Sequence, residues 1–268
     1  MGIMDPVRDK NFQILPKHKF RISNGMEGIM RCSRYSFGPN RLHYCGPDAN
    51  RELRDLIESG ESNLGLAHLL KQFKTLFPYL KQIAKANSIA DPFDSRVVEA
   101  YWLGNELLEN VEKNVLYYFL VDDLKIKDKI DNREFHQLEE KIKQGALPHH
   151  SFHILNVWTQ EGHGDSLGNL ERMNECRISS GIVTAVKGPE ITVSTEPLIY
   201  VNGKLALGEA VSKKLIRQLE SEYDIEQIKP GEIVSIHWSV PCEVITKKQE
   251  ETLRKYTLKN ITFANLTL

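Results

Sequence analysis

The sequence is poor in cysteine and has no long hydrophobic run. Its four cysteines are too few and too widely spaced for a disulfide framework: Cys32, Cys45, Cys176 and Cys242. The longest apolar candidate, residues 115–121, has seven residues, whereas a membrane-spanning helix needs about 20. Residues 1–10 also lack the apolar run and cleavage site of a secretory signal. We therefore expect a cytoplasmic protein with reduced thiols and no membrane partner.

A strong net charge and the common catalytic motifs are absent as well. The formal net charge of −1 is not that of a protein that binds nucleic acid through a basic surface, so we expect no nucleic-acid partner. The sequence contains no HExxH, CxxC or GxSxG motif, and no glycine-rich loop of the phosphate-binding forms. No residue can therefore be assigned a catalytic role from a known motif.

The composition that is present indicates a globular protein. Hydrophobic residues make up 41% of the 268 residues and charged residues 26%, enough for a real core in one large domain or two modest ones. Residues 1–49 are rich in Gly, Pro, Asn and Arg, and residues 1–41 carry eight Lys or Arg against three Asp or Glu, a local charge of +5. We expect residues 1–49 to form an irregular basic arm.

Residues 50–147 have the pattern of an α-helical domain. Leucine and phenylalanine residues over 64–77 recur at helical spacing. Asp91 followed by Pro92 combines a capping side chain with the residue favoured in a first helical turn. These signals predict four to six helices before residue 148.

Residues 148–268 change to strand and turn patterns, which makes the whole chain α+β. Residues 150–158 are β-branched and aromatic, which favours a strand, and Asn202-Gly203 is typical of a hairpin turn. Thr246 can cap a last helix that ends near residue 260. The same patterns predict an amphipathic helix over 209–223 and further strands over 178–186, 191–195 and 232–238.

Three short patterns lie in sequence order between residues 176 and 258. They are CRISSGIV at 176–183, KPGEIVSIH at 229–237, and an apolar strand at 240–245 that leads into a Glu-rich helix at 246–253. Together they resemble the small β-barrel chaperones of the HypC/HupF family, which help to assemble the active site of nickel–iron hydrogenases. The resemblance covers under a third of the chain.

The resemblance implies both a fold and a role. It predicts a small OB-like β-barrel with a terminal helix within residues 148–268, similar to the family from residue 176 onward. It implies a non-catalytic metallocentre assembly chaperone in which Cys176 and His237 handle an iron fragment, held transiently. The implied partner is a hydrogenase large subunit or a maturation factor. The residue types suit this role, because a thiolate is a soft ligand for iron and imidazole is a common second ligand.

The chain departs from that family in three ways. The family's cysteine follows the initiating Met and bears a free amino terminus, whereas Cys176 lies within the chain. Ser180 stands where the family has Pro, and the expected helix over 209–223 interrupts the barrel. The resemblance therefore supports the β-barrel fold more strongly than the chaperone role.

Two other clusters support an alternative, a metal-dependent enzyme with a site between the two domains. On a strand, His149 and His153 share one face while His150 points the other way. Two imidazoles on one face suit zinc, provided that a further ligand comes from elsewhere. His43 and Cys45 lie in a loop bracketed by Gly-Pro pairs and are candidate ligands for the same site.

A second resemblance concerns the N-terminal part. Residues 37–48, 91–94 and 99–105 resemble an uncharacterised bacterial family, which implies no mechanism. This leaves room for a third functional hypothesis, an interaction module whose barrel has kept its shape and lost its metal role.

Overall fold

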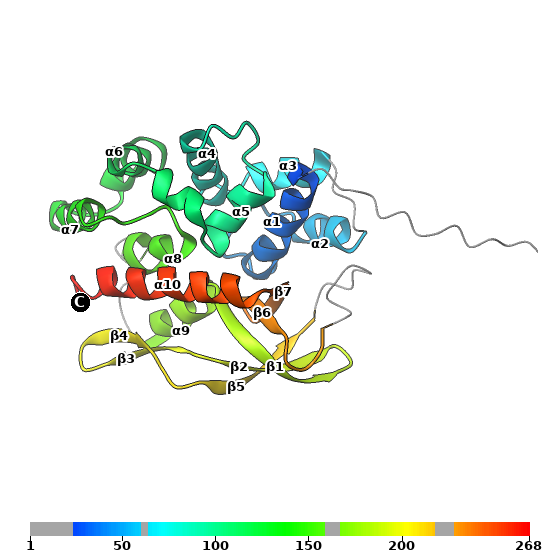
Figure 1. Cartoon of the computed structure of the whole chain (residues 1–268). Coiled ribbons are helices and arrows are strands. Elements are labelled where there is room, and N and C mark those ends of the chain that lie inside the picture. Colours follow the sequence, from blue (N-terminus) through cyan, green and yellow to red (C-terminus); the bar gives the residue numbers. More distant parts are fainter. Residues whose placement is uncertain (1–23, 60–63, 159–166, 218–227) are drawn as a thin grey trace, which may run out of the picture.

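The computed structural model describes residues 24–59, 64–158, 167–217 and 228–268, which form a helical half and a sheet half (Figure 1). The α+β class is therefore confirmed. Helices occupy the N-terminal half, and the C-terminal region is rich in sheet and ends in a helix. Within these residues, no helix is both long and apolar enough to cross a membrane.

The helical half contains seven α-helices and three short 3-10 or π segments among the described residues up to Lys143. Capping side chains explain several starts: Asp94 accepts a hydrogen bond from the Arg96 amide, and Asp131 forms a capping box with Glu134. The elements are α1 Asn24–Arg41, α2 Asn50–Glu58, α3 Leu64–Lys71, α4 Leu76–Ala86, α5 Ser95–Trp102, η1 Glu106–Asn110, α6 Lys113–Tyr118, η2 Phe119–Asp123, η3 Ile126–Asp128 and α7 Asn132–Lys143.

The remaining elements lead into the sheet and end in a long helix. Thr246 caps the start of this last helix, as the sequence predicted, and Gln249 completes a capping box with it. The helix continues to Ala264, beyond the expected end near residue 260. The elements are α8 His150–Phe152, η4 His153–Val157, α9 Leu167–Cys176, β1 Ser179–Lys187, β2 Glu190–Thr195, β3 Leu198–Val201, β4 Lys204–Leu207, β5 Val211–Ile216, β6 Ile233–His237, β7 Val240–Ile245 and α10 Lys247–Ala264.

The main sheet has five antiparallel strands in the order β5-β2-β1-β6-β7. Strands β3 and β4 form a separate hairpin whose turn is Asn202-Gly203, with positive φ at both residues, as a tight two-residue turn requires. Strands β5 and β7 are the edges of the main sheet. The predicted strand-rich region is present, but closure of the sheet into an OB-like barrel is not shown.

The expectation of an irregular arm over residues 1–49 is wrong for residues 24–41, which form α1. Gly38 and Pro39 lower the intrinsic helix propensity of this segment. Burial outweighs that cost, because Cys32, Tyr35 and Phe37 are all at most 2% exposed. Residues 1–23 of the expected arm lie outside the described residues.

Two other sequence predictions are wrong about secondary structure. Residues 150–157, expected as a strand, are helical in α8 and η4. This segment is buried on all sides, so its apolar residues show no alternation that separates a strand from a helix. Residues 211–216 of the expected helix over 209–223 form β5, paired with β2, while residues 218–223 lie outside the described part of the chain.

A shared cluster of buried apolar residues joins the two halves, and two smaller clusters lie in the C-terminal region. The largest cluster of buried residues joins helices α1 to α6 with Val240, Cys242 and Ile245 of β7 and with Leu253 and Tyr256 of α10. Helix α10 lies between the helical half and the sheet (Figure 1). Residues at this junction are therefore held from both sides.

Candidate metal centre

The pairing of β1 with β6 brings Cys176 close to His237. Ser179 is paired with Ile236, so the residues just before β1 and those just after Ile236 meet at the same end of this antiparallel pair. The Trp238 amide donates to the Glu175 carbonyl (2.8 Å), and the Ser239 hydroxyl donates to the Glu175 carboxylate (2.7 Å). The C-terminus of α9 is thereby fixed against the β6–β7 turn.

His237 is the last residue of β6 and is 1% exposed. Its Nδ1–H donates to the backbone carbonyl of Tyr35 in α1 (2.6 Å), which leaves the lone pair on Nε2. This Nε2 is buried and makes no hydrogen bond of normal geometry, although the Cys176 carbonyl lies close enough to favour a proton on the ring. The contact with α1 is close, because a Cβ added to Gly38 would lie 2.6 Å from the His237 carbonyl oxygen.

His150 begins α8, whose N-cap residue is His149. Its Nε2–H donates to the Cys176 carbonyl (2.8 Å), so its Nδ1 accepts from the Tyr101 hydroxyl (3.1 Å). The His150 ring packs against Trp102 with centroids 4.6 Å apart and meets the His237 ring edge-on at 5.2 Å. These contacts bring α5, α8 and β6 together around one point.

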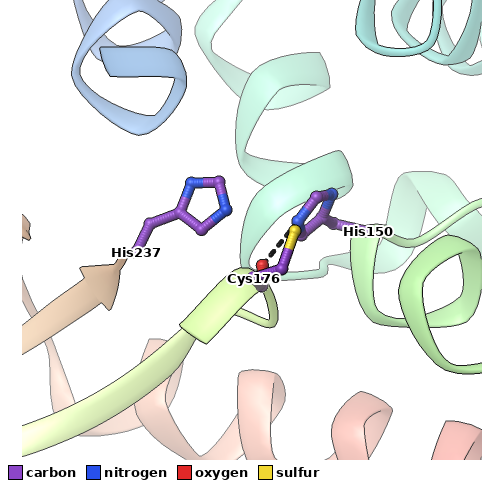
Figure 2. Close-up of side chains that lie close together, drawn as sticks. All are labelled: His150, Cys176 and His237. Atoms are coloured by element: carbon purple, nitrogen blue, oxygen red, sulfur yellow. Dashed lines mark hydrogen bonds between the residues drawn. The ribbon is translucent and has the colours of Figure 1, made fainter. Parts of the chain in front are cut away.

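The side chains of His150, Cys176 and His237 converge there (Figure 2). One ligand atom from each of the three residues lies within 4.8 Å of the others. Thiolate sulfur and imidazole nitrogen are the donor types that bind zinc and iron in proteins. This His/Cys/His cluster could therefore hold a metal ion, and the geometry does not identify which metal.

Burial keeps all three side chains neutral near pH 7. It raises the pKa of the Cys176 thiol to about 12 and lowers the pKa of His237 to about 4, although the Tyr35 and Cys176 carbonyls favour the protonated His237 ring. Burial also lowers the pKa of His150 well below its ordinary value, helped by His237. Neutral imidazoles have lone pairs available for a metal, whereas the thiol must lose its proton on binding.

Cys176 retains partial solvent exposure, unlike the two histidines. The Trp238 indole N–H forms no full hydrogen bond but lies near enough to the sulfur to favour the thiolate. Tyr44 stacks on Trp238 with ring centroids 4.5 Å apart. The adjacent Cys45 lies close enough to raise the pKa of Cys176 further.

The other metal ligands that the sequence suggested lie outside this cluster and have other partners. His149 Nδ1 accepts a hydrogen bond from the Ser151 hydroxyl (2.7 Å), and His153 Nδ1 contacts the Tyr79 hydroxyl (3.3 Å). His43 is a surface residue that pairs with Asp48 (3.2 Å). None of these histidines, nor Cys45, belongs to the described cluster of three ligand atoms.

The residue that sequence reasoning left out is His150. A strand over 150–158 would place it opposite His149 and His153, but the segment is helical and His150 joins the pair that the family resemblance implied. No short-range spacing could have revealed this, since the three residues come from separate parts of the chain. The weak signal available was the group of three histidines before an apolar run.

Comparison with known proteins places these features in one family. No curated protein and no solved structure matches the chain. The model of DUF6390, a family of unknown function, matches residues 24–268. This match confirms the expected membership of an uncharacterised family. It also shows that the similarity is not limited to the N-terminal part, because the matched range runs from α1 to α10 and includes all three cluster residues. Because the match spans most of its length, the protein belongs to the DUF6390 family.

Proposed function

We propose that this protein binds a thiophilic transition metal at the His150–Cys176–His237 cluster and acts as a metallocentre assembly chaperone. One observation carries the proposal: the ligand atoms of these three residues lie within 4.8 Å of one another. Iron is the metal that we assign, with zinc as the alternative, because both accept thiolate and imidazole ligands.

The arrangement suits a carrier better than a permanently buried structural site. Structural zinc sites are closed by four protein ligands, whereas this cluster offers three, one of which is partly exposed. A metal held by three protein ligands keeps a coordination position open, through which another protein can take the metal by ligand exchange. The internal position of Cys176 removes the free amine of the HypC/HupF chaperones, and His150 supplies a third donor instead.

The family resemblance gives this proposal its finer form. In it, the protein carries an iron fragment to a hydrogenase large subunit or receives it from a maturation factor. Cys176 holds the metal, His237 co-ligates it, and the helical half presents the partner surface that the short barrel chaperones lack. The resemblance of residues 176–258 supports this form.

Metal analysis of anaerobically purified protein tests the first part. After loading with ferrous iron, we expect one iron per chain in the unmodified protein and a loss of at least ten-fold in affinity in Cys176→Ser and His237→Gln. His43→Gln is the matched control, because His43 is a surface histidine outside the cluster. Iron or zinc binding that survives Cys176→Ser overturns the assignment.

A transfer experiment tests the chaperone role. Protein loaded with radioactive iron is mixed anaerobically with a hydrogenase large subunit that lacks its metal centre, and the two are separated. We expect iron on the large subunit only with cluster-intact protein. Iron that stays on the loaded protein supports the alternative, a metal-dependent enzyme whose open coordination position takes a substrate instead.

A further inference from the structure

Two stacked aromatic rings lie beside the thiol of Cys176. The indole N–H of Trp238 is buried and lies near the sulfur, and the ring of Tyr44 stacks on the indole with an interplanar angle of 20°. Tyr44 is 55% exposed, so this ring is the outer one of the pair. The residue Cys176 is partly exposed, but burial raises the pKa of its thiol to about 12. The sulfur itself is therefore shielded from water.

The backbone that carries Trp238 is in an unfavourable conformation. Trp238 and Ser239 are the two residues between the paired His237 and Val240, and their φ angles are +51° and +58°. Two-residue hairpin turns of this kind favour Asn and Gly, because a bulky side chain disfavours left-handed backbone. Backbone strain next to a candidate site points to a role for the side chain that it directs. Here it directs the indole towards the cluster.

Glu175 of α9 holds this turn in place. Its carbonyl accepts a hydrogen bond from the Trp238 amide (2.8 Å), and its carboxylate accepts one from the Ser239 hydroxyl (2.7 Å). The same carboxylate pairs with Lys213 of β5. Helix α1 also packs against the base of the indole side chain, since a Cβ added to Gly38 would lie 3.1 Å from the Trp238 Cβ. The inner ring is therefore carried by a fixed backbone.

The outer ring is held less firmly than its backbone. The Tyr44 amide donates to the Pro39 carbonyl (3.0 Å), which fixes the main chain against the end of α1. The ring itself is held by the stack on Trp238 and by Arg172 of α9, whose guanidinium carbon lies 5.9 Å from the ring centroid. Exposed side chains change rotamer much faster than main-chain segments move. Tyr44 can therefore turn away from the indole while its backbone hydrogen bond stays intact.

We propose that the stacked rings of Tyr44 and Trp238 form a cover that controls access to the Cys176 sulfur. This inference rests on the proposed function, and it adds the side from which a metal enters and leaves the cluster. In the closed form, the rings keep water and small molecules away from the sulfur. Rotation of Tyr44 is the first step of opening. Because the outer ring is not a ligand, its removal accelerates loading and release together and leaves the metal affinity unchanged.

Alkylation of the full-length, metal-free protein with iodoacetamide tests the cover, with modified Cys176 quantified by peptide mass spectrometry. We expect Tyr44→Ala to raise the rate at Cys176 by about 3- to 10-fold, the range for loss of one stacked aromatic pair. Tyr44→Phe keeps the ring, so its rate should stay within about two-fold of that of the unmodified protein. The fully buried Cys32 is the internal control, because global unfolding would accelerate alkylation there as well.

Tyr118→Ala is the matched control variant, because Tyr118 is 60% exposed and contacts an aromatic neighbour, Tyr117, on α6. It should leave the rate at Cys176 unchanged. The proposal is overturned if Tyr44→Ala alkylates Cys176 within two-fold of the unmodified rate, or if Tyr118→Ala produces the same acceleration. An acceleration in Tyr44→Ala that is equal at Cys176 and Cys32 also overturns it.

Anaerobic transfer of ferrous iron to an excess of chelator tests the link to metal exchange. We expect Tyr44→Ala to raise the rates of loading and release by the same factor, with the affinity within about two-fold of that of the unmodified protein. Unchanged rates would overturn the role of the cover in metal exchange. A failure of the unmodified protein to bind iron contradicts the proposed metal function instead, and the alkylation rates still decide whether the rings cover Cys176.

Discussion

The two histidines of the cluster differ in whether a ring nitrogen is free to bind a metal. His237 donates from Nδ1 to the Tyr35 carbonyl and leaves Nε2 without a hydrogen bond of normal geometry, so its tautomer is already that of a ligand. His150 uses both nitrogens in hydrogen bonds, to Tyr101 and to the Cys176 carbonyl. It must release one of them to bind a metal. The Tyr101 hydroxyl can accept as well as donate, so it permits that change of tautomer.

Removal of the Tyr101 hydroxyl should therefore weaken metal binding. We expect Tyr101→Phe to lower iron affinity by about 10-fold or more, since outer hydrogen bonds of ligating histidines have effects of this size. Anaerobic competition with a chelator of known affinity measures it. Tyr79→Phe is a matched control, because Tyr79 contacts His153 in the same manner outside the cluster. Equal effects of both variants on affinity would contradict this role for Tyr101.

A buried histidine outside the cluster, His153, should make stability depend on pH. Burial lowers its pKa to about 4, with a smaller effect of Lys129, whereas the unfolded chain titrates near 6.5. Between these values the unfolded state binds more protons, so the free energy of unfolding falls as the pH falls from 6.5 to 4. The contribution of His153 is at most about 1.4 kcal/mol per pH unit.

Urea unfolding of metal-free protein at several pH values measures this dependence. The His153→Gln variant should show a slope against pH that is smaller by up to one proton, whatever its absolute stability. An unchanged slope in His153→Gln would show that His153 is protonated equally in the folded and unfolded states.

Helix α1 packs with its backbone very close to the residues that precede α5. A Cβ added to Gly28 would overlap the carbonyl oxygen of Phe93, just before α5. Gly28→Ala should therefore lower the free energy of unfolding by about 2 kcal/mol or more, because the helices would have to separate. Chemical denaturation measures the change.

Gly145→Ala separates this steric effect from a conformational one. Gly145 has a φ of +96° and nothing within 4 Å of an added Cβ, so the substitution strains the backbone without a clash. We expect a loss of about 1 kcal/mol. A Gly28→Ala variant no less stable than Gly145→Ala would contradict the close approach of α1 to Phe93.

The elements that sequence predicted correctly are those with local signals. Thr246 forms a capping box and Asn202-Gly203 forms a tight turn, and both depend on neighbouring residues alone. Helix α1 and the helical segment that begins at His150 lacked such signals, and burial in the shared core determines their structure. The same holds for the candidate site. Cys176 and His237 could be predicted from a recognised sequence pattern, whereas the place of His150 in the cluster depends on tertiary packing.

For the molecule as a whole, the cluster links the two halves of the fold. His150 comes after the helical half, and Cys176 and His237 flank the paired strands β1 and β6. A metal that binds only the folded protein stabilises it by about 2.7 kcal/mol when its free concentration is 100 times Kd. We expect ferrous iron to raise the thermal midpoint of the unmodified protein under anaerobic conditions and to leave that of Cys176→Ser unchanged. The same increase in both proteins would place the metal elsewhere.

The distribution of the three ligand residues along the chain has a consequence for biosynthesis. His237 is made after His150 and Cys176, which have no third donor until then. A ribosome-bound or truncated chain ending before residue 237 therefore lacks the full cluster. Under the proposed function, binding by all three ligands is therefore open only to chains whose synthesis has passed that residue, and we expect incomplete products to compete poorly for iron.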